Sequence, residues 1–499
     1  MQSETPSDSQ QQTRAIGRAA VRAAVWAFFS TAGGKVITLV SLALLARLLA
    51  PREFGLLAFA LAYMTYVEAI GDLGSGVALV YWPDRREEAA QVTFLINIAA
   101  GLFWFLLSVA AAPLIADFFD APQGTNIVRV LAVGFLIKFA GNAHDALAQK
   151  DLRFRARTIP ELGFAALKAG IALVLAWFGF GAWSLVWGHL AGVTCKTVLL
   201  WTIVPWRPNW SYPKDLMKPM LGYGRGIIAL NILAAITHHA DLAVIGRFFG
   251  TTALGLYQMA GKVPEATVIV LLWVTSKVLF PAFAKVHSAG ESLRKPYLIA
   301  TRYISVITLP AAIGLSALSR PIVETFFGKQ WLPSAPILSA LAVAAAVRCI
   351  SSHAGDVLKA VGRTGLMAKL GVIKAIFTLS MLLAAATFGS PVTTAWALAA
   401  SFAITTVMTL VIASSIIGVT MREIAWSFAP AVGASAAMAV TLYLYLRIAH
   451  GHTALVQLIG GVILGTIVYL ALISVIDREI FRRVRHYFVA RRDVAKAAG

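Results

Sequence analysis

Long apolar stretches dominate this sequence and restrict the folds that it can adopt. An apolar stretch of about 20 residues can cross a bilayer as a helix, because a helix satisfies its backbone hydrogen bonds internally. We count fourteen such stretches, at residues 25–49, 54–81, 89–116, 126–148, 159–179, 181–204, 220–249, 252–281, 297–320, 333–359, 364–388, 391–418, 423–448 and 453–476. The sequence therefore predicts an all-α polytopic membrane protein, in agreement with its 59% hydrophobic and 13% charged residues.

Basic residues are distributed unequally between alternate connections. When the N-terminus is placed inside, the inner segments hold 28 Lys and Arg residues and the outer segments hold six. An excess of Lys and Arg marks the cytoplasmic side, so both termini are predicted to be cytoplasmic. The net charge of +20 then reflects topology and contact with anionic membrane lipids, and no nucleic-acid partner is expected.

The sequence also contains a weak internal repeat. Arg47–Leu56 aligns with Arg247–Leu256, and Pro113–Phe119 aligns with Pro321–Phe327. The matches occur in the same order along both halves, which predicts two pseudo-symmetric six-helix lobes with one orientation and two further C-terminal helices. Parallel repeats of this kind surround a central cavity in transporters.

This organisation predicts six segments. They are a cytoplasmic N-terminal segment at 1–24, an N-lobe at 25–204, a cytoplasmic linker at 205–219, a C-lobe at 220–418, the last two helices at 419–476 and a basic cytoplasmic tail at 477–499.

Charged side chains within the apolar stretches are the candidate functional residues, because a charge at the bilayer centre costs at least ~2.5–3.5 kcal/mol. Cations outnumber anions nine to four in this set, which suits an anionic ligand such as a diphosphate. The candidate diphosphate ligands are Lys35, Lys138, Lys168, Lys262, Arg348 and Lys374. The candidate coupling or gating residues are Glu68, Asp72, Asp241 and His239. Lys168 and Lys374 occupy equivalent repeat positions and are expected to face one another across the cavity.

These candidates also have structural interpretations. Lys35, Lys168 and Lys374 can instead form ion pairs with the intramembrane carboxylates. Asp72 lies near a helix break, where capping competes with function, and His239 can be a packing residue. Three further cations lie near predicted helix ends and are expected to reach the headgroups: Lys196, Lys277 and Arg129.

Several local motifs resemble one transporter family. They are Arg47-Leu-Leu-Ala-Pro-Arg-Glu-Phe-Gly55, Asp72-Leu-Gly74, the segment from His239 to Tyr257, Leu279-Phe-Pro281 and Phe327-Gly-Lys-Gln-Trp331. Over residues 25–420 the chain resembles the Wzx-type oligosaccharide flippases, in the polysaccharide transporter family of the multidrug/oligosaccharidyl-lipid/polysaccharide exporter superfamily. The resemblance implies translocation of an undecaprenyl-diphosphate-linked oligosaccharide repeat unit to the periplasmic leaflet of the inner membrane, for exopolysaccharide or lipopolysaccharide O-antigen synthesis. A polysaccharide polymerase and a chain-length regulator are its expected protein partners.

Two other functions compete with this interpretation. An enzyme is disfavoured, because the sequence has no nucleophile–base, metal or nucleotide motif and no sizeable loop opposite the cytoplasm. No cofactor or metal is therefore expected. The alternative is an ion-coupled multidrug or cation antiporter of the same superfamily. A cation exporter needs anionic cavity residues, so the cationic candidates favour an anionic lipid-linked substrate.

The topology can be tested by cysteine-accessibility labelling of Gln123→Cys and Gly290→Cys variants with a membrane-impermeant maleimide. We expect Gln123→Cys to be labelled from outside intact cells and Gly290→Cys only after the membrane is opened, because the basic segments mark the inner side. Labelling of both positions from one side would contradict the topology.

Overall fold

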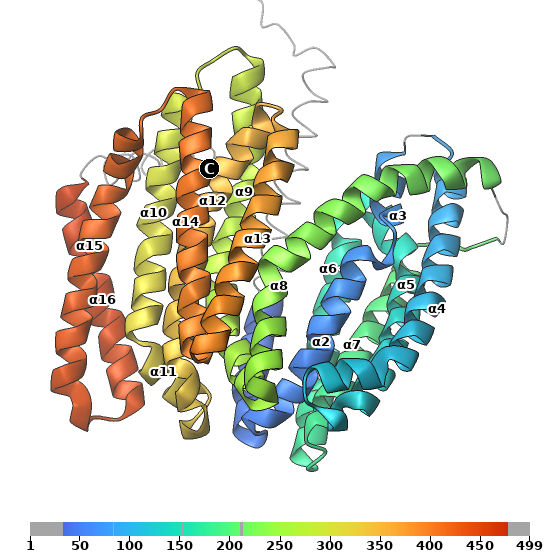
Figure 1. Cartoon of the computed structure of the whole chain (residues 1–499), viewed down its shortest axis with the longest axis horizontal. Helices are drawn as coiled ribbons and strands as arrows, with labels where there is room; N and C mark the ends of the chain where they lie inside the picture. Colours follow the sequence, from blue (N-terminus) through green and yellow to red (C-terminus); the bar gives the residue numbers. More distant parts are fainter. Residues whose placement is uncertain (1–32, 83, 152, 210–212, 478–499) are drawn as a thin grey trace, which may run out of the picture. The chain divides into compact units, whose positions relative to one another are not determined.

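The structure, a computed structural model, consists of helices joined mostly by short turns (Figure 1). It describes residues 33–82, 84–151, 153–209 and 213–477, and no strand occurs among them. Residues 33–48 are helical. The elements that follow are α2 (Pro51–Gly71), α3 (Ser75–Tyr81), α4 (Arg86–Phe118), η1 (Pro122–Gly124), α5 (Thr125–Lys150), α6 (Phe154–Trp177), α7 (Ala182–Ile203), α8 (Lys214–Pro264), η2 (Glu265–Ile269), α9 (Val270–Ser288), α10 (Arg294–Ala317), α11 (Ser319–Phe326), η3 (Lys329–Ser334), α12 (Ala335–Ala360), α13 (Thr364–Phe388), α14 (Pro391–Ile417), α15 (Met421–Ile448), η4 (Ala449–Gly451) and α16 (Ala454–Ile476).

Many of these helices are suited to a membrane. Within the described residues, eleven helical segments are long and apolar enough to cross one. One of them, Asn231–Leu272, has 42 residues, about twice the length that a single crossing requires. The chain is therefore an all-helical, multi-pass membrane protein, as predicted. The number of fourteen crossings stays a prediction, and its first stretch, 25–49, begins outside the described residues.

Local backbone geometry explains where the predicted helices break. The stretch predicted at 54–81 is divided into α2 and α3, because Leu73 and Gly74 adopt left-handed conformations with φ of 51° and 70°. The Asp72 carboxylate accepts a hydrogen bond from the Gly74 amide at 2.9 Å and stabilises this turn. In α8 the break occurs at Gly250, where φ is 78° and the chain leaves the helical region. A π-helical turn, η2, directly follows Pro264.

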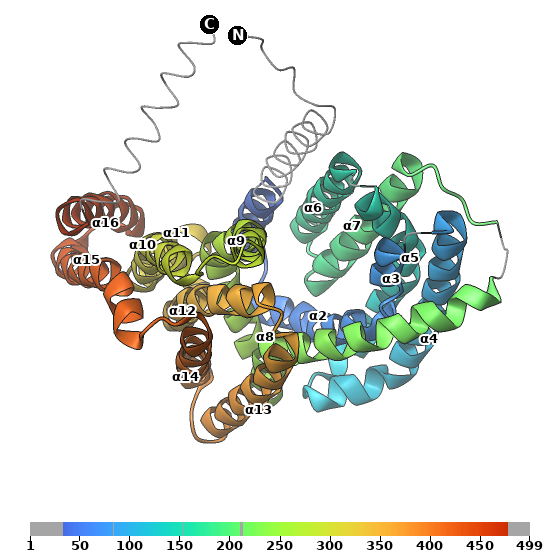
Figure 2. The same cartoon turned by 90° about the horizontal axis from the view of Figure 1, so that it is seen from above.

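Two compact units divide the chain. The first, Met1–Gly255, contains α2 to α7 and most of α8; within it α6 packs on α7, α4 on α5, and α5 on α7 (Figure 2). In the second, Leu256–Gly499, α12 packs on α14 and α10. In the same unit, α15 packs on α10 and α16. The division falls at Gly255, inside the segment predicted as the C-lobe, and the predicted domain boundaries stay predictions.

An ion pair fixes the start of α8 within the first unit. Arg85, at the turn between α3 and α4, donates hydrogen bonds to Asp215 of α8 and to Glu88 of α4. The hydrogen bond from Arg85 holds the pKa of Asp215 below its usual range. A lowered pKa keeps this carboxylate ionised at neutral pH, so the stabilising contact is lost only as the pH falls into the acid range.

Further along α8, two glycines make a reciprocal close contact with α2. A Cβ on Gly55 would lie 1.7 Å from the carbonyl oxygen of Thr251, and a Cβ on Gly255 would lie 2.0 Å from that of Pro51. No side chain fits at either distance. The internal repeat aligns Pro51 with Thr251 and Gly55 with Gly255, so the contact of Gly55 with Thr251 recurs, with the two halves exchanged, as the contact of Gly255 with Pro51.

Substitution of Gly55 tests this contact. We expect Gly55→Ala to lower the thermal unfolding temperature of the detergent-purified protein, because overpacking costs about 1–3 kcal/mol. Gly170→Ala in α6 is the matched control, since a Cβ there meets nothing within 4 Å and alanine favours a helix. Tryptophan fluorescence during heating measures both variants. Equal unfolding temperatures for the two would contradict the contact.

Candidate functional site

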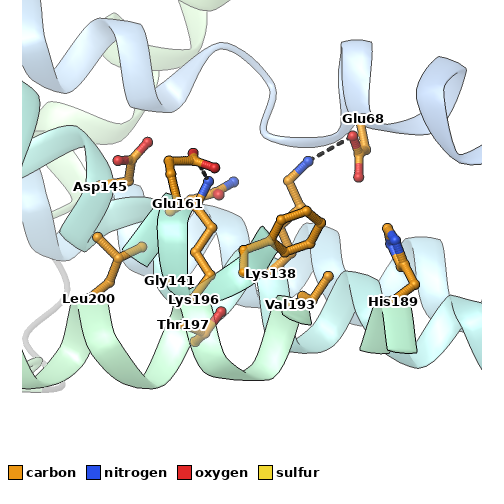
Figure 3. Close-up of a pocket in the computed structure, with 12 residues that line it drawn as sticks. Glu68, Lys138, Gly141, Asp145, Glu161, His189, Val193, Lys196, Thr197 and Leu200 are labelled. Carbon is orange, nitrogen blue, oxygen red and sulfur yellow. Dashed lines mark hydrogen bonds and ion pairs between the residues drawn. The ribbon is translucent and has the colours of Figure 1, made fainter. Parts of the chain in front are cut away.

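A polar cavity lies within the first unit, bordered by α2, α5, α6 and α7 (Figure 3). It has a volume of about 190 Å³, and an adjoining space of about 260 Å³ extends toward α3 and α8. The two spaces share four lining residues, which are Glu68, Lys138, Asn142 and Asp145. We refer to the two spaces together as the polar cavity.

An ion pair between α2 and α5 crosses this cavity. The Nζ atom of Lys138 lies 2.8 Å from Oε2 of Glu68, and each side chain is about one-third exposed, at 36% and 35% (Figure 3). The pair joins a candidate diphosphate ligand to a candidate coupling residue. Because each charge offsets the other, the apolar helices can hold both charges at reduced cost.

Two further ion pairs lie at the polar cavity. Lys196 of α7 lies 2.5 Å from Glu161 of α6, and Arg157 of α6 binds both carboxylate oxygens of Asp145 on α5, at 2.9 and 3.2 Å. These contacts join α5, α6 and α7. Among the described residues that line the polar cavity, carboxylates outnumber lysines four to two: Glu68, Asp72, Asp145 and Glu161 against Lys138 and Lys196.

Close packing of α6 against α7 positions Lys168 beside the polar cavity. A Cβ on Gly188 would lie 2.7 Å from the carbonyl oxygen of Lys168, so the two helices approach at van der Waals contact. The Lys168 ammonium lies 5.5 Å from the centre of the Phe164 ring, and the Phe164 and His189 rings are perpendicular, with their centroids 5.9 Å apart. Phe164 and His189 both line the cavity. The structure therefore brings Lys168 and Lys138 to the same region.

A buried network of neutral polar side chains adjoins the polar cavity. Asn142 donates to Asn97 at 2.8 Å, and Asn97 donates to the Ser75 hydroxyl at 2.9 Å and to the Thr93 carbonyl at 2.8 Å. Asn97 is fully buried. Asparagine within an apolar stretch was the signal that could have predicted this network, but the sequence-based prediction considered charged side chains.

Two other residues of the first unit were missed for a different reason. Asp145 and Glu161 lie near the ends of predicted helices, next to a connection rich in basic residues, and were not counted as intramembrane charges. The signal was the alternation of opposite charges across this connection, with Asp145 before it and Arg157 after it.

The other candidates of the first unit lie outside the lining of the polar cavity. Lys35 is half-buried in the helix at 33–48, and His239 and Asp241 are half-buried in α8. Asp241 accepts a hydrogen bond from the Leu242 amide at 2.9 Å and interacts electrostatically with Tyr66 of α2. Their roles stay predictions.

The second unit holds the remaining three candidates. Lys262 forms an ion pair with Glu265 at 2.8 Å, across the junction of α8 and η2. Lys374 of α13 donates to the Ser351 hydroxyl of α12 at 3.4 Å, and Arg348 is half-buried on α12. The expectation that Lys168 and Lys374 face one another stays a prediction.

Sequence comparison assigns the family. The sequence pattern of the family described as Polysaccharide biosynthesis protein matches residues 44–336, more than half of the chain. The chain belongs to this family. The match confirms the relationship that the local motifs predicted.

Relatives in this family extend along most of the chain. The succinoglycan biosynthesis transport protein ExoT of Rhizobium meliloti is 27% identical over 477 residues, covering 95% of this chain and 96% of the relative. The teichuronic acid biosynthesis protein TuaB of Bacillus subtilis is 28% identical and covers 75% of this chain and 78% of the relative. For the lipopolysaccharide biosynthesis protein WzxC of Escherichia coli, identity is 25% and the covered shares are 71% and 72%.

Solved structures share the fold of this family member. A lipid II flippase, MurJ in an inward closed conformation, superposes with a TM-score of 0.76 at 15% identity, covering 92% of this chain and 100% of that one. An inward-facing multidrug resistance transporter of the MATE family gives a TM-score of 0.64 at 13% identity, with 77% and 94% covered.

The Lys138–Glu68 pair can be tested by a double-mutant cycle. We expect Lys138→Ala and Glu68→Ala to be coupled by about 0.5–1 kcal/mol of unfolding free energy, because each single change leaves a charge without its partner. The cycle is measured by thermal unfolding of the purified protein. The Lys262–Glu265 pair is the control, since it has similar exposure but joins neighbours along one segment, and about 0.3–0.5 kcal/mol is expected for it. Additive effects at Lys138 and Glu68 would contradict the ion pair.

Proposed function

We propose that this protein is a flippase for a polyprenyl-diphosphate-linked oligosaccharide. It moves an undecaprenyl-diphosphate-linked repeat unit from the cytoplasmic to the periplasmic leaflet of the bacterial inner membrane, for the synthesis of a surface polysaccharide. The observation that carries the proposal is the similarity, over 95% of the chain, to a succinoglycan biosynthesis transport protein. The fold shared with a lipid II flippase supports a lipid-linked substrate.

The proposed layout is that predicted from the sequence. Fourteen helices form two six-helix lobes and a C-terminal pair around a central cavity, and both termini are cytoplasmic. Alternating access between the lobes moves the head of the substrate across the membrane. Transport of this kind breaks no covalent bond, so the protein is not an enzyme. A polymerase and a chain-length regulator would then use the exported unit.

Paired charges in the polar cavity suggest how a diphosphate is captured. Lys138 is held by Glu68, and a phosphate oxygen offers the same charge-assisted hydrogen bond as a carboxylate. An incoming diphosphate therefore replaces Glu68 at Lys138 without leaving the lysine unpaired. Lys168, next to Phe164 and His189, adds a second positive charge nearby. Release of Glu68 gives this carboxylate the opportunity to bind a proton or a cation, which fits its predicted coupling role.

A second candidate function is ion-coupled export of cationic drugs. The observation that favours it is the excess of carboxylates over lysines among the described residues of the polar cavity. An anionic lining attracts cations, and the fold is also similar to that of a multidrug resistance transporter.

A deletion strain separates the two functions. We expect lipid-linked saccharide to accumulate in the cytoplasmic leaflet when this protein is absent, because synthesis continues while translocation stops. Extraction of lipid-linked saccharides, with leaflet-specific enzymatic labelling, measures the accumulation. Normal lipid intermediates together with lower drug tolerance would instead support the antiporter.

Variants of Lys168 test its proposed contact with the diphosphate, and Lys168→Arg is the comparison that keeps the charge. Lys168→Arg keeps the charge and should restore export, whereas Lys168→Glu should fail because it repels the phosphate. Lys168→Ala should weaken capture roughly tenfold, the equivalent of losing one charge-assisted hydrogen bond. Expression in the membrane fraction must stay equal. Full export by both Lys168→Glu and Lys374→Glu would exclude these lysines as diphosphate ligands.

A further inference from the structure

An apolar groove lies between α9 and α10 in the second unit. Its volume is about 470 Å³, within the range of pockets that hold small ligands. One face of α9 and one face of α10 form it, and the lining residues include Val278, Ala282, Phe283, Ile299 and Ala300. Thr275 and Tyr303 are the lining residues with hydroxyl groups, and the Thr275 hydroxyl is already hydrogen-bonded to His353 at 3.1 Å.

Positive charges lie at one end of this groove. Val286 and Pro296 line that end, and their neighbours Lys285 and Lys295 are both exposed. Arg294, the first residue of α10, is paired with Glu423 of α15 at 2.6 Å, and the turn between the two helices carries the exposed Glu291. The groove thus combines an apolar channel with a cationic mouth, which matches a ligand with a hydrocarbon chain and an anionic head.

The length of the groove also fits a chain that enters from one leaflet. Its lining on α9 extends from Thr275 to Val286, a distance of about 16 Å at the helical rise of 1.5 Å per residue. This is about half of the ~30 Å hydrocarbon core. The mouth lies at the connection predicted to be cytoplasmic, where the substrate is loaded.

We propose that the α9–α10 groove binds the isoprenoid chain of the polyprenyl diphosphate carrier while the substrate is being loaded, with its diphosphate at Lys285 and Lys295 before it is captured at Lys138. This proposal rests on the proposed function and deepens it. A single groove between two helices accommodates one chain, whereas a phospholipid has two. A diphosphate also carries more negative charge than a phosphodiester and therefore gains more from a cluster of cations.

Photo-crosslinking tests the groove with the full-length protein in nanodiscs. The probe is an undecaprenyl diphosphate with a diazirine on its isoprenoid chain, and mass spectrometry locates the labelled residues. We expect labels on α9 and α10 at the lining residues, retained in the presence of an equal concentration of phosphatidylglycerol. Labels confined to other helices, or displacement by phosphatidylglycerol at that concentration, would overturn the proposal.

Groove-filling variants provide the matched comparison. Ala282→Trp and Val278→Trp fill the groove from exposed positions, so folding should be preserved, and labelling should fall about tenfold or more. Ile307→Trp is the control, since Ile307 is 54% exposed on α10 and does not belong to the groove lining. Unchanged labelling in both filled variants would overturn the proposal.

Charge variants test the mouth. Lys285→Ala combined with Lys295→Ala should reduce labelling about tenfold, and Lys369→Ala, an exposed lysine on α13, should not change it. Equal labelling of the double variant and of Lys369→Ala would overturn the proposed diphosphate contact.

Export measured in cells separates the groove proposal from the proposed flippase function. Normal export by Ala282→Trp would exclude the groove while the flippase stands, whereas a deletion strain with normal lipid intermediates would exclude the flippase.

Discussion

A charged side chain inside a bilayer has little water around it, so its energy depends on the neighbours that the fold provides. For three cations around the polar cavity these neighbours are carboxylates. Lys138 lies against Glu68, Lys196 against Glu161 and Arg157 against Asp145. Each pair joins two different helices, so the same contacts that make the charges tolerable also hold α2, α5, α6 and α7 around the polar cavity.

Because the cavity charges are paired, an excess of Lys and Arg in the sequence does not determine the charge of the ligand. The net charge of a transport protein says little about a cavity in which each lining lysine is paired with a carboxylate. A pair of opposite charges can exchange partners with a substrate of either sign, because an anion replaces the carboxylate and a cation replaces the lysine. Whether the substrate is a lipid diphosphate or a cationic drug therefore depends on which replacement, that of the carboxylate or that of the lysine, allows translocation.

The sequence was informative about elements and less informative about partners. Apolar length predicted the helices, and the helix ends at α10, α13, α14 and α16 agree with the predicted stretches to within a few residues. The boundary between the stretches predicted at 220–249 and 252–281 coincides with the break at Gly250, and Asp72 was placed near a helix break, but the stretch at 54–81 was predicted as one crossing and is divided there. Partners could not be predicted in the same way, because an ion pair such as Lys138–Glu68 joins residues 70 positions apart and depends on how the helices pack. Asp145 and Glu161 were missed since a position near a helix end was taken as a position outside the membrane.

The reciprocal contact of Gly55 and Gly255 has an evolutionary consequence. If the two halves of the chain arose by duplication of one segment, a single ancestral glycine supplied both sides of this crossing in a symmetric ancestor. After duplication the two copies were free to diverge elsewhere, but at this point each copy remained the steric environment of the other. Close packing thus keeps a glycine at both positions, so the pair still marks the duplication where the surrounding sequence has become dissimilar.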